Sequence, residues 1–246
     1  MVATHPAPEI TEIFYPSSDG EPLAETSVHV DAIIHAVVAL REYLKPQQAI
    51  VLADQYLYYA QGFPKLRVAP DVMVIWNVSP GPRDNFKTWE EGSIPAVIFE
   101  MTSEGTRNQD QDYKKTLYEQ MEVKEYWLFD PKGEWIPEQL RGYRLQDEQY
   151  QPITDSRSEP LQLRLQVDNT LIGFYREDTG EKLLAPSELV AALQKEVQAR
   201  QDLEKQLAQE QQRTEDERQR ADRAETQVRE LMERLRLLGV DPNGEG

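Results

Sequence analysis

The sequence predicts an α/β domain with a mixed central sheet flanked by helices, followed by a long C-terminal helix. Helical and strand patterns alternate through the first 185 residues, and two of the expected strands are apolar on both faces. At Pro186 the composition changes abruptly, because proline, glycine and aromatic residues vanish and good helix formers dominate. These observations predict one folded domain with a helical appendage.

Charge and cysteine content exclude several classes of function. The formal net charge is −17 and there is no cysteine, so neither a disulfide framework nor a thiolate zinc site can form. The acidity argues against non-specific coating of nucleic acid, but not against catalysis on DNA, since a bound divalent cation reverses the local field. The start of the chain does not resemble a signal peptide, and no apolar run approaches the roughly 20 residues of a membrane span. We therefore expect a soluble cytoplasmic protein without a membrane partner.

The elements of the domain follow from periodicity and from turn residues. Residues 1–24 are expected to form an extended lead-in to a domain spanning 25–185. Apolar residues recur at helical spacing from Ser27 to Leu44, and Pro46 ends this first helix. The further expected elements are strands at 49–60, 67–78, 94–102 and 124–131, a helix at 110–121, and marginal hairpin strands at 142–153 and 161–169.

The segment 186–238 is predicted to be one helix with coiled-coil character, followed by a flexible tail at 239–246. On a heptad frame, one seam position holds Leu193, Leu207, Ala221, Val228 and Leu235, and the other holds Leu203, Ala224, Leu231 and Leu238. Glu210, Thr214 and Glu217 weaken the middle of this seam. We expect the helix to form a homodimer or to bind a partner protein, and the alternative is a solvated amphipathic helix lying on its own domain.

One strand carries a charge at a position that should be buried. In IPAVIFEMT, alternation places Ile98 and Glu100 on one face and Val97 and Phe99 on the other. Because both faces are apolar, this strand should be central and covered on both sides. An unpaired carboxylate there is costly, so Glu100 requires a cation, a hydrogen-bond network or a proton.

A second acidic residue occupies a comparable place. Asp71 follows Pro70 at the start of DVMVIW, another expected strand that is apolar on both faces. Two carboxylates at the ends of neighbouring buried strands suggest a hard divalent cation held by oxygen ligands. Taken alone, an aspartate after a proline is more often a turn residue, so a structural polar network is the alternative to a metal site.

The expected helix at 110–121 supplies a cationic candidate. Its inward face should hold Lys114, Leu117, Tyr118 and Met121, and its solvent face Lys115, Glu119 and Glu122, which can pair in water. Lys114 would then point toward the strand of Glu100, where its ammonium could reach an attacking water or a phosphate. A single helix lysine is more often one whose stem packs while its ammonium stays in solvent.

From Pro70 to Pro131 the sequence resembles the Uma-type restriction endonuclease family, which is abundant in cyanobacteria and belongs to the PD-(D/E)XK nuclease superfamily. The resemblance covers roughly the first 185 residues. The family pattern falls on Pro70, Asp71, Glu100, Ser103, Thr106, Arg107, Asp110, Lys114, Tyr118, Glu125, Tyr126 and Trp127. The parent superfamily has its lysine two residues after the glutamate, where this chain has Thr102, and the Uma-type pattern moves it to the helix. The chain departs from the family at Glu104, Glu122 and Lys124.

The resemblance implies a restriction-endonuclease-like core that cleaves DNA phosphodiester bonds with Mg²⁺ or Mn²⁺. Asp71 and Glu100, with the backbone carbonyl of Met101, would hold the cation. Asp71, Glu100 and Lys114 would form the catalytic set. Lys114 would orient or deprotonate the water, or stabilise the phosphorane, and the sequence leaves this choice open.

Other polar and aromatic candidates are weaker. Gly105, Thr106 and Arg107 precede the helix and could donate hydrogen bonds to a phosphate. His29 lies near the start of the first helix, and His35, six residues on, is expected at the surface or half-buried. The four tryptophans and the tyrosines are expected to be core or cover rather than a stacking platform, since basic residues between the aromatics are sparse.

Two functional hypotheses follow. The first is a metal-dependent DNA endonuclease that dimerises through its C-terminal helix. The second is a weak or inactive nuclease fold that serves as a scaffold, with the coiled coil as its interaction module. The acidic balance favours the second hypothesis, whereas the intact set of Asp71, Glu100 and Lys114 favours the first.

Overall fold

The computed structural model of the chain describes residues 13–19, 26–103, 105–106 and 109–238. The chain divides into two compact units, Met1–Pro186 and Ser187–Gly246, at the place where the composition changes. Among the described residues, the first unit contains the sheets and the helices that precede α4, and α4 forms the second unit up to Leu237.

The helices of the first unit begin with α1 (Ser27–Leu44), whose first turn is capped by Thr26. The side-chain oxygen of Thr26 accepts a hydrogen bond from the His29 backbone N–H, which satisfies a donor that the helix leaves unpaired. The other helices are α2 (Thr88–Glu91), the π-helix η1 (Gln109–Lys114) and α3 (Lys115–Gln120). The strands are β1 (Ala49–Leu52), β2 (Leu57–Tyr58), β3 (Arg67–Val68), β4 (Val72–Trp76), β5 (Phe86–Lys87), β6 (Val97–Met101), β7 (Glu125–Phe129), β8 (Leu140–Gln146), β9 (Gln149–Ile153), β10 (Arg157–Ser158), β11 (Leu163–Asp168) and β12 (Leu171–Arg176).

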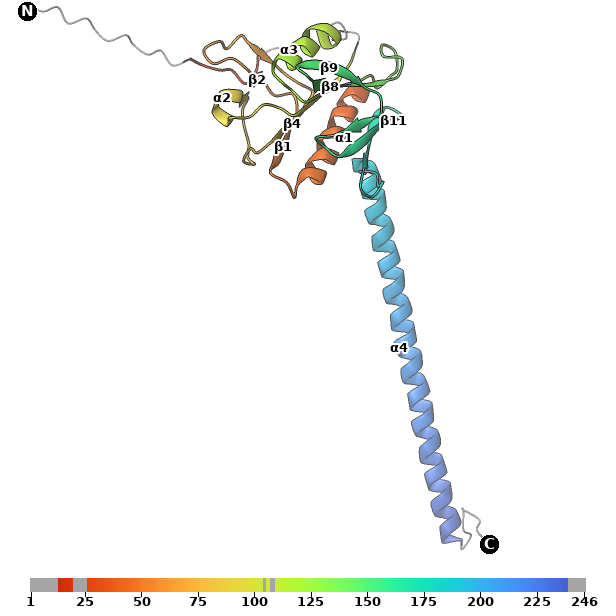
Figure 1. The fold of residues 1–246 in the computed structure, drawn as a ribbon. Helices are drawn as coiled ribbons and strands as arrows, with labels where there is room; N and C mark the ends of the chain where they lie inside the picture. The colour runs from red at the N-terminus through yellow and green to blue at the C-terminus, as the bar shows by residue number, and fades with distance from the viewer. Residues whose placement is uncertain (1–12, 20–25, 104, 107–108, 239–246) are drawn as a thin grey trace, which may run out of the picture. The chain divides into compact units, whose positions relative to one another are not determined.

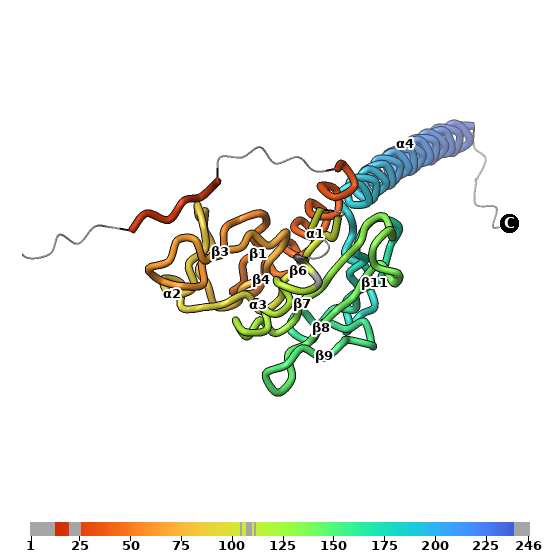
Figure 2. The backbone as a smooth tube through the Cα atoms, turned by 90° about the horizontal axis from the view of Figure 1, so that it is seen from above, coloured from red at the N-terminus to blue at the C-terminus, as the bar shows by residue number. Residues whose placement is uncertain are grey.

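A six-stranded sheet in the order β1-β4-β6-β7-β8-β9 forms the centre of the unit (Figure 2). β6 and β7 are parallel and the other neighbouring pairs are antiparallel, so the sheet is mixed, as predicted. Parallel neighbours need a crossover connection, and here η1 and α3 provide it. This crossover brings the residues of η1 and α3 over the end of β6.

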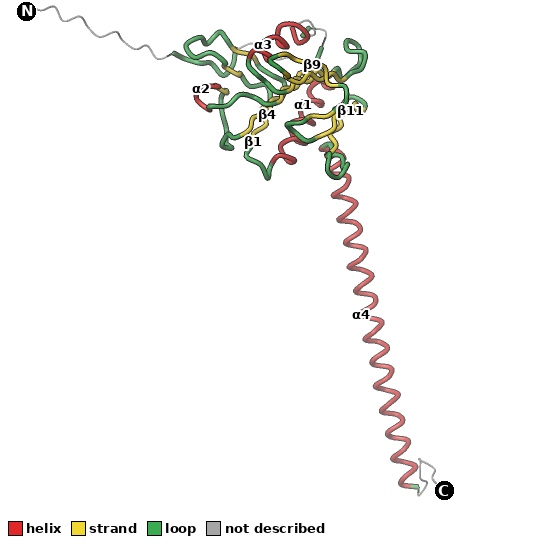
Figure 3. The backbone as a smooth tube through the Cα atoms, in the orientation of Figure 1, coloured by secondary structure: helices red, strands yellow, loops and turns green. Residues whose placement is uncertain are grey.

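The large sheet separates two apolar cores. On one face, α1 and the small sheet β10-β11-β12 share a core that includes Leu40, Phe99 and Phe174. On the other face, α3 and the small sheet β3-β2-β5 surround a core that includes Ile98 and Tyr118. Figures 1 and 3 show strands lying between α1 and α3. All five residues of β6 are buried, which confirms that this strand is central and covered on both sides.

Two of the expected strands are each divided in the structure. The stretch 49–60 forms β1 and β2, which lie in different sheets because the chain turns at Asp54, where φ is 48°. The stretch 67–78 forms β3 and β4, separated at Pro70, which has no N–H to extend a ladder. β5 and α2 lie in the stretch 79–93, which the sequence indicated only as turns. An apolar run does not reveal by periodicity that it contains two short strands.

The second unit is dominated by α4 (Pro186–Leu237), a continuous helix of 52 residues. From Leu189 to its end every residue is exposed. Its exposed apolar residues include Leu193, Leu207, Val228, Leu231 and Leu235, which the heptad frame placed in the seam. The predicted helix is therefore present, and its apolar stripe faces solvent in the single chain. No helix in the described part of the chain has both the length and the apolar character of a membrane span.

Candidate metal centre

Strand pairing brings Asp71, just before β4, next to Glu100, near the end of β6. In the antiparallel register of β4 and β6, Val72 pairs with Phe99, so the next position places Asp71 opposite Glu100. Asp71 Oδ2 accepts a hydrogen bond of 2.5 Å from the backbone N–H of Met101, the last residue of β6. The two carboxylates that the sequence placed at the ends of neighbouring strands are therefore adjacent in the structure.

Glu100 is buried, with 1% of its surface exposed, and both of its carboxylate oxygens have partners. The ammonium of Lys114 donates to Oε2 at 2.8 Å, and the hydroxyl of Tyr118 donates to Oε1 at 2.7 Å. η1 and α3 follow each other without a break and together form the crossover helix. Lys114, at the end of η1, and Tyr118, in α3, lie on its inward face, as their spacing predicted. Lys115 does not pair with Glu119 as expected, because its ammonium lies 4.2 Å from the centre of the Tyr143 ring.

Asp110 is a further acidic member of this cluster, and the sequence argument gave it no role of its own. It is 1% exposed, and its Oδ1 lies 2.9 Å from Lys114 Nζ. Within the described part of the chain, neither oxygen of Asp110 accepts a hydrogen bond of good geometry. Its i, i+4 spacing from Lys114 was the signal that could have revealed it, since that spacing puts both side chains on one helix face.

Burial and crowding perturb the protonation of the cluster. Burial raises the pKa of Glu100 to about 8, against the opposing charge of Lys114 and with a further increase from Asp71 and Asp110. Burial also raises the pKa of Asp110. For Lys114 burial acts to lower the pKa, but the carboxylates of Glu100 and Asp110 outweigh it and hold the pKa above its ordinary value. Lys114 is therefore a charged ammonium at neutral pH.

The charge balance of the cluster fits a divalent cation. Asp71, Glu100 and Asp110 supply three carboxylates, and Lys114 supplies one positive charge, which leaves an excess of two negative charges when all are ionised. Carboxylate oxygens are the hard ligands that Mg²⁺ and Mn²⁺ prefer. Among the described residues, no three acidic or histidine side chains converge into a ready-made metal cage. Glu100 instead turns its Oε2 toward Lys114.

Of the two histidines in α1, His29 lies near the start of the helix as predicted, whereas the prediction for His35 was wrong. His29 is 5% exposed, and its Nε2 lies 3.7 Å from Asp71 Oδ2, so the start of α1 belongs to the surroundings of the cluster. His35 is buried rather than at the surface or half-buried, because its Nε2 lies 2.8 Å from the carbonyl oxygen of Ile172 in β12. The small sheet that covers α1 was not predicted to pack there, and this explains the error.

The loop before the crossover helix contains the candidate phosphate donors. Arg107 lies outside the described residues. The Thr106 hydroxyl accepts a hydrogen bond from the Ser103 backbone N–H at 3.1 Å, and Gly105 is exposed. Thr106 therefore has a local structural contact at the end of β6.

Asp130 follows β7 at the same end of the central strands as Met101, but both oxygens of its carboxylate accept hydrogen bonds from its own loop. Oδ1 accepts hydrogen bonds from the backbone N–H groups of Lys132 and Gly133, and Oδ2 from those of Trp135 and Ile136. Four donors fix this loop beside a cavity of about 700 Å³ whose lining includes His29 and Thr102. Asp130 is thus a structural carboxylate.

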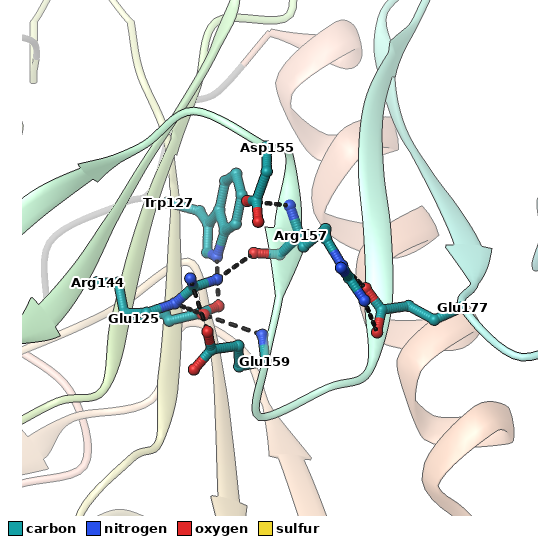
Figure 4. A network of polar contacts seen from close by, with 7 residues as sticks. All are labelled: Glu125, Trp127, Arg144, Asp155, Arg157, Glu159 and Glu177. Carbon is teal, nitrogen blue, oxygen red and sulfur yellow. Dashed lines mark hydrogen bonds and ion pairs between the residues drawn. The ribbon is translucent and has the colours of Figure 1, made fainter.

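Glu125 provides a second comparison. It is fully buried, and both of its carboxylate oxygens accept hydrogen bonds (Figure 4). Its Oε1 accepts from Arg144 Nε at 2.9 Å and from the Glu159 backbone N–H at 3.0 Å, and its Oε2 accepts from Trp127 Nε1 at 3.1 Å. This network joins β7 and β8 to the segment around β10. A buried glutamate with a dedicated arginine is a structural element, whereas the Glu100 cluster has more carboxylates than cations.

Comparison with known proteins places the chain in a family. A family model described as "Putative restriction endonuclease" (Uma2) matches residues 8–174, which is more than half of the chain. The chain belongs to the Uma2 family. A crystal structure of a "putative nuclease belonging to DUF820" from Anabaena variabilis ATCC 29413 is similar, with a TM-score of 0.39 and 15% identity over 58% of this chain and 77% of that chain. No curated protein matches the sequence.

Uma2 membership confirms the resemblance that the residues around Glu100 indicated. The matched range contains the central sheet and the crossover helix, and it ends before α4. The Uma2 chain therefore has a restriction-endonuclease-like α/β core with a mixed sheet, and a long C-terminal helix follows it.

Proposed function

We propose that this Uma2 chain is a metal-dependent endonuclease that hydrolyses DNA phosphodiester bonds at the Glu100 cluster. Asp71 and Glu100, with the Met101 carbonyl, would hold Mg²⁺ or Mn²⁺, and Asp71, Glu100 and Lys114 would be the catalytic residues. The observation that carries the proposal is that two buried carboxylates, Glu100 and Asp110, and the half-buried Asp71 outnumber the single ammonium among them. Such an arrangement is costly for folding alone, and a bound cation would compensate it.

The chemistry divides between the cation and the side chains. When bound, the cation supplies Lewis acidity toward a phosphate oxygen and an attacking water. The ammonium of Lys114 lies 2.8 Å from Glu100 and 2.9 Å from Asp110, and from this position it would stabilise negative charge developing on the phosphate. Asp110 would position that ammonium through its 2.9 Å ion pair, and Tyr118 would fix the orientation of Glu100 through its hydroxyl.

The proposal is tested by incubating the protein with supercoiled plasmid and with single-stranded DNA in Mg²⁺ or Mn²⁺. Cleavage by the native protein and its loss in Glu100→Gln are expected, because the substitution removes one negative ligand while it preserves shape. Undiminished cleavage by Glu100→Gln would place the active site elsewhere. Absence of cleavage on both substrates with either metal would count against a nuclease function.

A second candidate function is supported by α4. The exposed apolar side chains of this 52-residue helix need a covering surface, and water is a poor one. The segment 186–238 would then form a homodimer or bind a partner protein, while the domain at 25–185 carries the nuclease site. If the domain is catalytically inactive, the chain would act as an interaction module through α4 alone.

A further inference from the structure

A groove of about 620 Å³ lies on the side of β2 and β3, and Lys114 of the Glu100 cluster is part of its lining. Its lining includes Tyr56, Lys65, Arg67, Tyr113 and Lys114, together with the carboxylate residue Asp19. Lys114 is 9% exposed, and this groove is where its side chain can be reached. The chain passes directly from the groove at Ala69 to the candidate ligand Asp71. The groove therefore adjoins the proposed reacting centre through Lys114.

The groove combines cations with aromatic rings that are far apart in the sequence. The Arg67 guanidinium lies 4.4 Å from the centre of the Tyr56 ring, and its NH1 donates to the Pro64 carbonyl at 2.8 Å, so the cation is held in place. Tyr113 is 53% exposed. Burial, followed by the neighbouring Tyr113 hydroxyl, raises the pKa of Tyr59 to about 12.

Lys65 is the most accessible cation of the groove. It is exposed, and no carboxylate in the described part of the chain forms an ion pair with it. The same turn also exposes Phe63, at 62%. Cations that follow a strand of phosphates and rings that stack on bases are the two components of single-strand recognition.

We propose that this groove binds an unpaired nucleic-acid strand and that the substrate class of the enzyme is therefore single-stranded or frayed rather than fully duplex. In this arrangement Lys65 and Arg67 contact successive phosphates, and Tyr113 stacks on a base. The strand then continues to the phosphate position beside Lys114. This inference deepens the proposed nuclease function and rests on it for the chemical step, but not for binding.

Charge counting favours an unpaired strand over a duplex. Lys114 is already paired with Glu100 and Asp110, so Lys65 and Arg67 are the cations that the groove offers to phosphates. Two phosphate contacts are few for a duplex, especially on a chain of net charge −17. A single strand gains stacking on aromatic rings as well, and this contribution does not depend on salt.

The proposal predicts a specific salt dependence. For about two phosphate contacts on a single strand, the slope of log K against log salt concentration is about −1.4, so binding weakens about sevenfold between about 50 and 200 mM salt. Lys65→Ala should reduce the slope to about −0.7. Tyr113→Ala should weaken binding about tenfold with the slope unchanged, whereas Tyr113→Phe should bind like the native protein because the ring is kept.

Binding is measured by fluorescence anisotropy in EDTA, with labelled oligothymidine, oligouridine and a DNA duplex as probes. EDTA prevents metal-dependent cleavage, so binding is read without the reaction. Lys124→Ala is the matched control for Lys65→Ala, because Lys124 is an exposed lysine that lines a different part of the surface. Urea denaturation of each variant establishes that it folds as the native protein does.

The expected result is single-strand binding that exceeds duplex binding and is impaired by Lys65→Ala and Tyr113→Ala but not by Lys124→Ala or Tyr113→Phe. Oligouridine binding equal to oligothymidine binding would extend the substrate class to RNA, within the same proposal. Preference for duplex, or equal effects of Lys65→Ala and Lys124→Ala, would overturn it. Plasmid cleavage without oligonucleotide binding would overturn the groove and leave the nuclease proposal standing. Oligonucleotide binding without any cleavage would support the groove and count against the nuclease proposal.

Discussion

Glu100→Gln should make the metal-free protein more stable at alkaline pH, although it removes a residue of the proposed active site. The pKa of Glu100 is raised from 4.5 to about 8 in the folded state. Below pH 4.5 the carboxyl is protonated in both states, and between pH 4.5 and 8 the folded state holds a proton that the unfolded state has lost. Stability in EDTA therefore falls as pH rises through this window.

The magnitude follows from the gap between the two pKa values. Each tenfold difference in proton affinity corresponds to about 1.4 kcal/mol, so a gap from 4.5 to about 8 corresponds to about 5 kcal/mol of unfolding free energy between pH 4 and pH 9. Gln at position 100 carries no titrating proton. Its amide oxygen can still accept from Lys114, and its amide nitrogen can donate to the Tyr118 hydroxyl, so both contacts survive.

The assay is urea denaturation in EDTA at pH 5, 7 and 9 for the native protein, Glu100→Gln and Glu125→Gln. Subtracting the Glu100→Gln profile from the native profile isolates the contribution of this residue from those of other titrating groups. Glu125→Gln is the matched control, since Glu125 is as buried as Glu100 but paired with Arg144. It should destabilise the protein, because it removes the charged partner of a partly buried arginine.

The decisive comparison is the shape of the profiles. The native profile should decline more steeply with pH than the Glu100→Gln profile, and the variant should be the more stable of the two at pH 9. Parallel profiles, or a variant that is less stable at pH 9, would refute the view that Glu100 is a carboxylate in excess. In that case Lys114 would satisfy Glu100 fully, and the cluster would be a structural ion pair.

Three further outcomes are expected. Lys114→Ala should reduce cleavage about 100-fold or more, whereas Lys115→Ala should change it less than about twofold, and equal losses in a plasmid assay would contradict the assigned helix face. Truncation after Pro186 should leave a folded domain but lower the number of subunits measured by light scattering, and an unchanged number would remove α4 as the association element. Asp130→Ala should cost about 3 kcal/mol of unfolding free energy in urea, because four backbone N–H groups lose their acceptor, and a loss below about 1 kcal/mol would show that water replaces it.

The sequence was sufficient for the parts of the fold that rest on strong periodicity. Helix α1, the central strand β6 and the crossover helix were all expected, because long apolar patterns at a fixed period leave few alternatives. The inward orientation of Lys114 followed from the same spacing. The adjacency of Asp71 and Glu100 was inferred from their places at the ends of strands.

Features that depend on contacts between residues far apart in the chain could not be predicted from the sequence. His35 is buried by the carbonyl of Ile172, which is more than a hundred residues away in the chain. Asp54 and Pro70 divide strands that look continuous as apolar runs. The groove joins Arg67 to Tyr56 and Tyr113, and no local pattern predicts that these residues meet. The family pattern included Asp110 without giving it a role. Its spacing from Lys114 was a second signal, but a charged pair at that spacing is usually on the surface.

The proposed function depends on Asp71 and Glu100, with the Met101 carbonyl, holding a divalent cation. A calorimetric titration of Mn²⁺ at pH 8 into the native protein, Glu100→Gln and Glu134→Gln tests it most directly, because Glu134 is an exposed glutamate outside the cluster. We expect one saturable site in the native protein and in Glu134→Gln, and an affinity at least tenfold weaker in Glu100→Gln. Indistinguishable titrations of the three proteins would contradict it.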